Sequence, residues 1–301
     1  MAQKPTLQFD LKKLPPGFGR ALLVSQGMAL LWWALAAWLH PQNIIPIWFD
    51  QTSTFMVVAQ NVSAPYAASA RFLNPPWTAL LLWPFGLLPL EVSTLLQTCL
   101  YFAILTGVVF KFGGGRGALL ITLVSFVAMD AVLELNIDWL PSIGLLVPPA
   151  LSGVFLAIKP QLLLGYWLSL KRDDLLRALT VTAGVAALSL LLWGWWLPLA
   201  IANNAGVSEG RMSFNIAPPV LLTPYLAYPL GLLLAYVAWR RKDAVIGILA
   251  WLFFVPYVTL YSLLPVWAVC SARWPRFMLL VNVVMWVVYG GTIALGLLRR
   301  I

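Results

Sequence analysis

Charged residues are scarce in this chain. Asp, Glu, Lys and Arg together make up 10% of its 301 residues, whereas 61% of the residues are hydrophobic. Soluble domains carry about 25% charged residues, so this composition excludes a protein whose whole surface faces water. Apolar runs of about 18 or more residues recur along the chain, which is typical of a polytopic helical membrane protein.

Histidine and cysteine are nearly absent. His40 is the only histidine, and the two cysteines, Cys99 and Cys270, both stand inside apolar segments. These residues exclude a disulfide framework and argue against a histidine metal site or a catalytic triad. The chain also lacks a Walker loop, a GxSxG element, an HExxH element and a dinucleotide fingerprint. We therefore expect no tightly bound cofactor; a divalent metal ion could still bind, but nothing in the sequence supports one.

The net charge of +9 comes from Lys and Arg residues that stand at the ends of apolar runs. No soluble module gathers them, which excludes nucleic acid as a partner. The positive-inside rule and anionic lipid headgroups explain this placement. The few acidic residues also lie at the ends of runs, whereas ion or proton transport normally requires acids in mid-membrane. A transporter is therefore the least favoured class.

The apolar runs predict an all-α fold of about ten transmembrane helices, within a range of about nine to eleven. The expected spans are 21–39, 76–89, 93–111, 117–131, 139–157, 160–170, 178–197, 220–239, 244–270 and 277–298. Residues 1–20 would form a cytoplasmic tail, and 21–301 would form a single transmembrane domain. Both termini would then be cytoplasmic, and the polar loops 40–75 and 198–219 would lie on the outer side. Lys111 and Arg116 would also lie outside, against the charge rule, so either one element is re-entrant or that turn is an exception.

The outer loop 40–75 carries the first candidate for chemistry. Small, polar and apolar residues alternate at helical spacing over 50–61, which indicates a short interfacial helix. Asp50 opens this stretch and could act as a general base toward a hydroxyl. It could equally be the N-cap of the short helix. Farther on, Asn74 and the two prolines after it predict a rigid approach to the next span.

Three later segments offer polar groups at membrane depth. Lys159 precedes Pro160 and Gln161, and it could bind an anionic phosphate or extend its ammonium to the interface. Asn136 and Asp138 could bind a headgroup, or they could cap the following span. Arg211 stands among Asn203, Asn204 and Asn215, a set that offers sugar or phosphate ligands or simply forms a solvated loop.

Several of these segments occur in the order found in one enzyme family. They are Asp50, Ala64-Pro65-Tyr66, Asn74-Pro75-Pro76, Leu133-Glu134-Leu135-Asn136, the run SGVFLAIKPQ at 152–161, Lys171-Arg172 and the run FFVPYVTLYSLLP at 253–265. In these segments the chain resembles the polyprenol-phosphate-sugar-dependent membrane glycosyltransferases of the GT-C fold, most closely the mannosyltransferase-like glycosyltransferase family 87. It departs from the family pattern at Asn74, Glu134 and Val255, where an aromatic residue, a glutamine and a serine are usual.

The resemblance implies an inverting sugar transferase, working at the outer face of a bacterial plasma membrane. The donor would be a polyprenyl-phosphate sugar, such as a mannose donor, and the acceptor a hydroxyl of a lipid or glycan. Asp50 would be the catalytic base, and the apolar spans would hold the prenyl tail. Substrate-binding roles would fall to Lys159, Arg211, Tyr66, Asn74, Gln161 and Asn136. The alternative is a non-catalytic assembly subunit or lipid-binding relative of the same fold.

Overall fold

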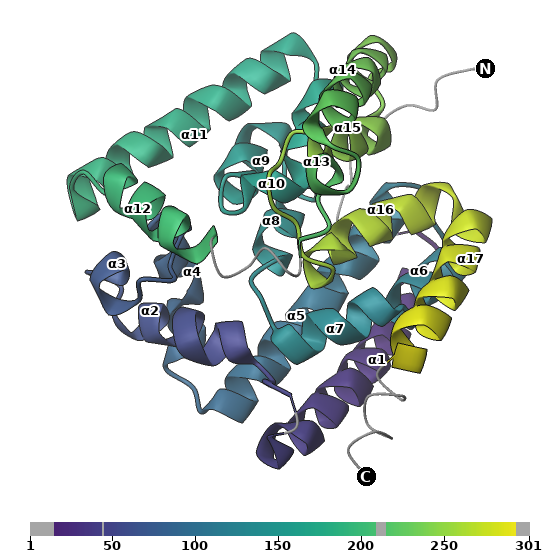
Figure 1. Ribbon diagram of the computed structural model, residues 1–301, viewed down its shortest axis with the longest axis horizontal. Coiled ribbons are helices and arrows are strands. Elements are labelled where there is room, and N and C mark those ends of the chain that lie inside the picture. The colour runs from purple at the N-terminus through teal and green to yellow at the C-terminus, as the bar shows by residue number, and fades with distance from the viewer. Residues whose placement is uncertain (1–14, 44, 209–214, 293–301) are drawn as a thin grey trace.

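The computed structural model describes residues 15–43, 45–208 and 215–292. Within these residues the chain forms helices joined by turns and loops, and no strand (Figure 1). The all-α prediction is therefore confirmed for the described part of the chain. The expected cytoplasmic termini fall largely outside it, on residues 1–14 and 293–301.

Three described helices are long and apolar enough to cross a membrane. They are α1 (Phe18–Leu39), which continues through a 3-10 turn η1 (His40–Gln42), α5 (Leu90–Lys111) and α11 (Arg172–Trp193). The helices α6 (Arg116–Leu123) and α7 (Phe126–Glu134) form a pair bent by 53°, which would count as a fourth span. Three or four such helices in the described residues are fewer than the roughly ten expected spans.

Several of the other expected spans are divided into shorter helices. The span 220–239 is an exception, because most of it forms one helix of 18 residues, and the expected polar loop 198–219 contains a helix, α12. In chain order, the remaining elements after α7 are α8 (Trp139–Ile143), α9 (Pro149–Leu156), α10 (Pro160–Leu163), η3 (Leu164–Ser169), α12 (Leu197–Ser208), α13 (Pro218–Leu221), α14 (Pro224–Arg241), α15 (Ala244–Leu252), η5 (Tyr261–Leu263), α16 (Leu264–Arg273), α17 (Pro275–Met285) and η6 (Trp286–Gly290). Many of them begin with proline, which lacks the N–H that a continuing helix would need and suits the first turn instead. Proline therefore acts here mainly as a helix start, and it divides the apolar runs.

The loop 40–75 contains a short helix over the stretch 50–61, where one was expected. It consists of a π-helical turn η2 (Gln51–Phe55) and α2 (Met56–Gln60), followed by α3 (Pro65–Ala68). The next helix, α4 (Trp77–Gly86), has ten residues and is about 15 Å long, half of what a bilayer requires. It ends beside α2, where the Gln60 side chain donates a hydrogen bond of 3.1 Å to the Gly86 carbonyl. The chain therefore returns to α2 before α5 begins.

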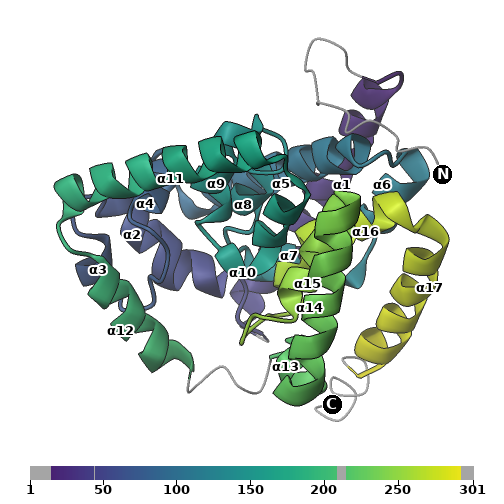
Figure 2. The same cartoon turned by 90° about the horizontal axis from the view of Figure 1, so that it is seen from above.

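Five turns rich in Lys and Arg are linked by contacts at one end of the molecule, here called the basic end. Gly17, before α1, packs against the Arg116 guanidinium so closely that a β-carbon added at Gly17 would lie 2.5 Å from it. One added at Gly114, between α5 and α6, would meet Ala272 at 2.9 Å near the end of α16. Figure 2 shows the turn between α16 and α17 close to α6.

The same end is extended by two polar contacts. Lys242, after α14, donates a hydrogen bond of 3.0 Å to the carbonyl of Leu170, just before α11. Arg273 lies 3.7 Å from Asp243, which begins α15. The turns before α1 and α11, and those after α5, α14 and α16, therefore form one connected end. Because α1 is about 33 Å long, the chain that follows it lies at the opposite end.

The last described helix leads away from the basic end. Asn282 donates a hydrogen bond to the Ile121 carbonyl, and Trp286 donates one to the Val124 carbonyl. The Tyr289 ring then stacks on Phe126. The contacts advance along both segments, so α17 and η6 run in the same direction as α6 and α7.

Candidate functional site

Six buried or half-buried polar side chains meet at the end opposite the basic end, and we call them the polar cluster. They are Asp50, Asn136, Asp138, Lys159, Tyr261 and Ser262. They come from the start of η2, the loop between α7 and α8, the start of α10, and η5. Segments far apart in the sequence therefore build one site.

Among the residues that the structure describes, two side chains donate hydrogen bonds to Asp50. Its Oδ2 accepts hydrogen bonds from the Asn136 amide nitrogen at 2.5 Å and from the Tyr261 hydroxyl at 3.0 Å. It is 6% exposed, and its side chain makes no capping bond to η2, so the N-cap alternative does not describe it. The backbone before it is fixed by Trp48, a fully buried residue with φ of 55° whose N–H donates to the Leu133 carbonyl at 2.6 Å.

Asn136 connects Asp50 to Lys159. Its Oδ1 accepts hydrogen bonds from the Lys159 ammonium at 3.0 Å and from the Ile137 N–H at 2.7 Å. An ammonium and a backbone N–H only donate, and an ionised carboxylate only accepts. The amide oxygen must therefore face Lys159, and the amino group must face Asp50.

The Lys159 ammonium donates all its hydrogen bonds to side chains of the protein. Besides the bond to Asn136, it donates to Asp138 at 2.5 Å and to the Ser262 hydroxyl at 3.0 Å. Its side chain is 12% exposed, and that of Asp138 is 1% exposed. An ammonium has three donors, and each has a partner here. The alternative in which this lysine extends to the interface therefore does not describe its position.

Burial sets the protonation of the neighbouring groups. It raises the pKa of the Asp138 carboxyl, and the Lys159 charge opposes that shift. It also raises the pKa of the Tyr261 phenol, and the nearby charges of Asp50 and Asp138 raise it further. Tyr261 therefore keeps its proton and remains a hydrogen-bond donor to Asp50.

Two other predicted residues act on the backbone around the cluster. The Asn74 side chain donates a hydrogen bond of 2.7 Å to the carbonyl of Ile158, next to Lys159. The Tyr66 hydroxyl donates to the Asn74 carbonyl at 2.7 Å, and its ring stacks on Trp196. Asn74 and Tyr66 thus attach the loop 40–75 to the start of α10.

The remaining predicted residues lie elsewhere or outside the described part. Gln161 is half-buried in the first turn of α10. Arg211 falls in 209–214, outside the described residues. Asn203 and Asn215 donate to the carbonyls of Phe72 and Pro256, so each binds backbone from another segment.

Sequence reasoning did not single out Tyr261 or Ser262. Both belong to the segment 253–265, which contributed to the family resemblance only as a whole. Ser262 is 3% exposed and also accepts a hydrogen bond of 2.9 Å from Thr259. The sequence did contain a signal for them: hydroxyl side chains inside an apolar run that two prolines interrupt. Buried hydroxyls need hydrogen-bond partners, so such a run indicates a polar site.

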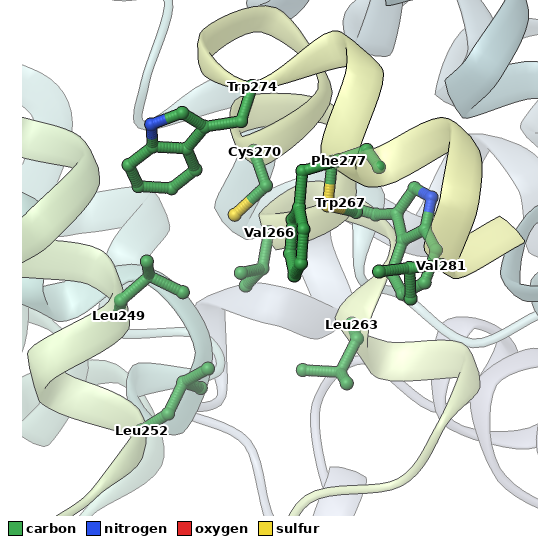
Figure 3. A pocket seen from close by; sticks show the side chains of 10 residues that line it. Leu249, Leu252, Leu263, Val266, Trp267, Cys270, Trp274, Phe277 and Val281 are labelled. Atoms are coloured by element: carbon green, nitrogen blue, oxygen red, sulfur yellow. The ribbon is translucent and has the colours of Figure 1, made fainter.

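An apolar groove begins at η5, the element that also carries Tyr261 and Ser262. It has a volume of about 300 Å³ and lies between α15, α16 and α17 (Figure 3). Leu263, the neighbour of Ser262 in the chain, lines it together with Leu252. Trp274 and Phe277 line the part near the basic end. The groove therefore runs from Leu263, which follows the cluster residue Ser262 in the chain, to Trp274 at the turn after α16.

Within the described residues, no three His, Cys, Asp or Glu side chains gather as a metal site would require. In comparisons with known proteins, no family model, curated protein or solved structure matches this chain. The family resemblance therefore stays a hypothesis, and the function must be argued from the cluster.

Proposed function

We propose that this protein is an integral-membrane glycosyltransferase with the polar cluster as its active site. It would move a sugar, such as mannose, from a polyprenyl-phosphate donor to an acceptor hydroxyl. One observation carries the proposal. The Asp50 carboxylate and the Lys159 ammonium, from distant segments, meet through the single amide of Asn136 beside an apolar groove.

Asp50 would act as the general base. The acceptor oxygen would form a bond to the anomeric carbon while its proton passes to Asp50. The bond between that carbon and the phosphate oxygen would break, and the polyprenyl phosphate would leave with the electron pair. Attack opposite the leaving group inverts the configuration of the sugar. A positioned general base contributes about 10²- to 10⁴-fold to such a rate.

Lys159 would serve the donor side. Its bonds to Asn136 and Asp138 hold it in place, and a phosphate oxygen could replace the Ser262 hydroxyl as its third partner. The cation would then stabilise the negative charge that grows on the departing phosphate. Arg211 remains the second predicted cation. The groove that begins at Leu263 would hold the prenyl chain.

The distribution of charge supports an orientation with the basic end in the cytoplasm and the cluster outside. In this arrangement α4 is the re-entrant element, because it returns to α2, and the turn from Lys111 to Arg116 lies inside. The conflict with the charge rule then disappears. A GT-C-like fold in a bacterial plasma membrane would use pairs of short helices for several of its crossings.

One observation favours a second candidate, a non-catalytic membrane scaffold. All three donors of Lys159 already have partners, and Asp138 balances its charge. A purely structural role, joining α8, α10 and η5, would account for such a network. In that case Asp50 would have no substrate.

Transfer from labelled donors decides between the two. The protein, in membrane vesicles with polyprenyl-phosphate mannose, should release polyprenyl phosphate and form a labelled product. Asp50→Asn should lower this rate by about 100-fold or more, because the amide cannot take the proton.

Asp173→Asn is the matched control, because it neutralises an exposed carboxylate in the first turn of α11. Its rate should equal that of the wild type, and both variants should keep the wild-type melting temperature. Full activity in Asp50→Asn would remove the carboxylate from the mechanism. A wild type that is inactive with mannose, glucose and arabinose donors alike would favour the scaffold.

A further inference from the structure

Arg71 is a cation at the cluster end that the mechanism does not use. It lies in the segment between α3 and α4, where its side chain is exposed. Its guanidinium carbon is 4.6 Å from the centre of the Phe49 ring, and Phe49 directly precedes Asp50. A cationic group therefore lies against Phe49, the residue that directly precedes the proposed base.

The position of Arg71 is fixed by its neighbours. Phe72 is fully buried, and its carbonyl accepts a hydrogen bond of 3.1 Å from Asn203 on α12. The Arg71 N–H donates to the Ser69 hydroxyl at 3.3 Å, and that hydroxyl donates to the Ser53 carbonyl in η2 at 3.4 Å. Stacking on a ring leaves the in-plane N–H donors of a guanidinium accessible. Among the described residues, the Arg71 side chain forms no ion pair.

The charge pattern makes this arginine unusual. Other described Lys and Arg residues stand in the five basic turns or within two helical turns of them, apart from Lys159. An exposed arginine at the opposite end is not explained by the positive-inside rule. The cluster itself holds two carboxylates and one ammonium, so an anionic substrate would need an additional cation to approach Asp50.

We infer that Arg71 binds a phosphate group of the acceptor and so places the acceptor hydroxyl at Asp50. The acceptor would then be an anionic glycerophospholipid, presented from the bilayer past the exposed side chains of Ile45 and Phe49. A guanidinium fits a phosphodiester through two parallel N–H donors. This inference rests on the proposed function, and it assigns the phosphate of the donor to Lys159 and that of the acceptor to Arg71.

Binding of short-chain lipids to the purified full-length protein tests the inference. Dioctanoyl phosphatidylglycerol is anionic, and dioctanoyl phosphatidylcholine has the same chains without net charge. Tryptophan fluorescence should show the wild type binding the anionic lipid about tenfold more tightly, as expected for one charge-assisted pair. Arg71→Gln should lose this preference, and Arg71→Lys should keep part of it.

Arg177→Gln is the control, because it removes an exposed arginine on α11 toward the basic end. It should keep the full preference. An Arg71→Gln protein that still prefers the anionic lipid would overturn the inference, as would a wild type without any preference. Tight binding of glycerol 3-phosphate alone would show a site for a free phosphate and overturn the lipid assignment. None of these results depends on Asp50→Asn, so the transfer experiment is judged separately.

Discussion

The two ends of the molecule use charge in different ways. At the cluster end, Lys159 and Asp138 are 2.5 Å apart, and their side chains are 12% and 1% exposed. At the basic end, Arg273 and Asp243 are 3.7 Å apart, and their side chains are 56% and 20% exposed. The chemical groups are similar, but water surrounds only the second pair.

This difference corresponds to two roles of charged residues: exposed ones orient a protein in the membrane, and buried ones can take part in chemistry. Exposed Lys and Arg residues can set the orientation of a membrane protein without fixed partners. Catalysis requires polar groups that are held in place and shielded from water before the substrate arrives. The cluster meets this requirement, because Asn136 orients Asp50 and is itself oriented by Lys159.

The largest effect should follow from breaking the buried pair. Lys159→Met would leave the Asp138 carboxylate buried without its cation, and we expect a loss of about 3–5 kcal/mol in the free energy of unfolding. Unfolding in detergent, followed by tryptophan fluorescence, measures it. The double variant Lys159→Met/Asp138→Leu should recover much of this loss, because no unpaired charge remains. A single variant as stable as the wild type would show that the pair does not constrain the cluster.

The next effect concerns the packing of η3 against α15. A β-carbon added at Gly165 would lie 2.0 Å from the Gly247 carbonyl oxygen, so the two backbones must separate. Gly165→Ala should cost about 1–3 kcal/mol of unfolding free energy, the range for overpacking. Gly184→Ala on α11 is the control, because nothing lies within 4 Å of its added β-carbon. Equal melting temperatures for the two variants would contradict the close backbone contact.

Part of the fold could be predicted from the sequence. The runs that became α1, α5 and α11 contain no proline, so their apolar length translates directly into a helix. The runs 139–157 and 244–270 divide before Pro149 and around Pro256, where proline interrupts the helical hydrogen bonds. Hydropathy alone does not distinguish a proline that kinks a span from one that begins a new helix.

The candidate site shows the same limit. Asp50, Asn136 and Lys159 stood out because polar groups among apolar residues need partners. That Asn136 joins the other two depends on Leu135, whose φ of 44° turns the chain after α7. Tyr261 reaches Asp50 only because the loop after α15 passes over the cluster. Tertiary packing sets the course of this loop, so the local sequence does not reveal it.

A smaller effect should follow from removing one donor of Asp50. Tyr261→Phe deletes the hydroxyl that lies 3.0 Å from the carboxylate, while Asn136 still holds Asp50. We expect a loss of about 1 kcal/mol in unfolding free energy, the usual value for one hydrogen bond. Under the proposed function, the transfer rate should fall more than stability does, because the carboxylate is less well oriented. Tyr225→Phe, on the exposed surface of α14, is the control.

The smallest effect should come from the exposed pair at the basic end. Arg273→Gln removes a charge whose partner is 3.7 Å away and whose side chain is 56% exposed. Double-mutant cycles on such pairs give about 0.2–1 kcal/mol, so the melting temperature should hardly change. Salt should also have little effect on the variant, since screening removes only what the pair contributed. A loss as large as that of Lys159→Met would end the contrast between the two ends, because burial would then not decide how much an ion pair contributes.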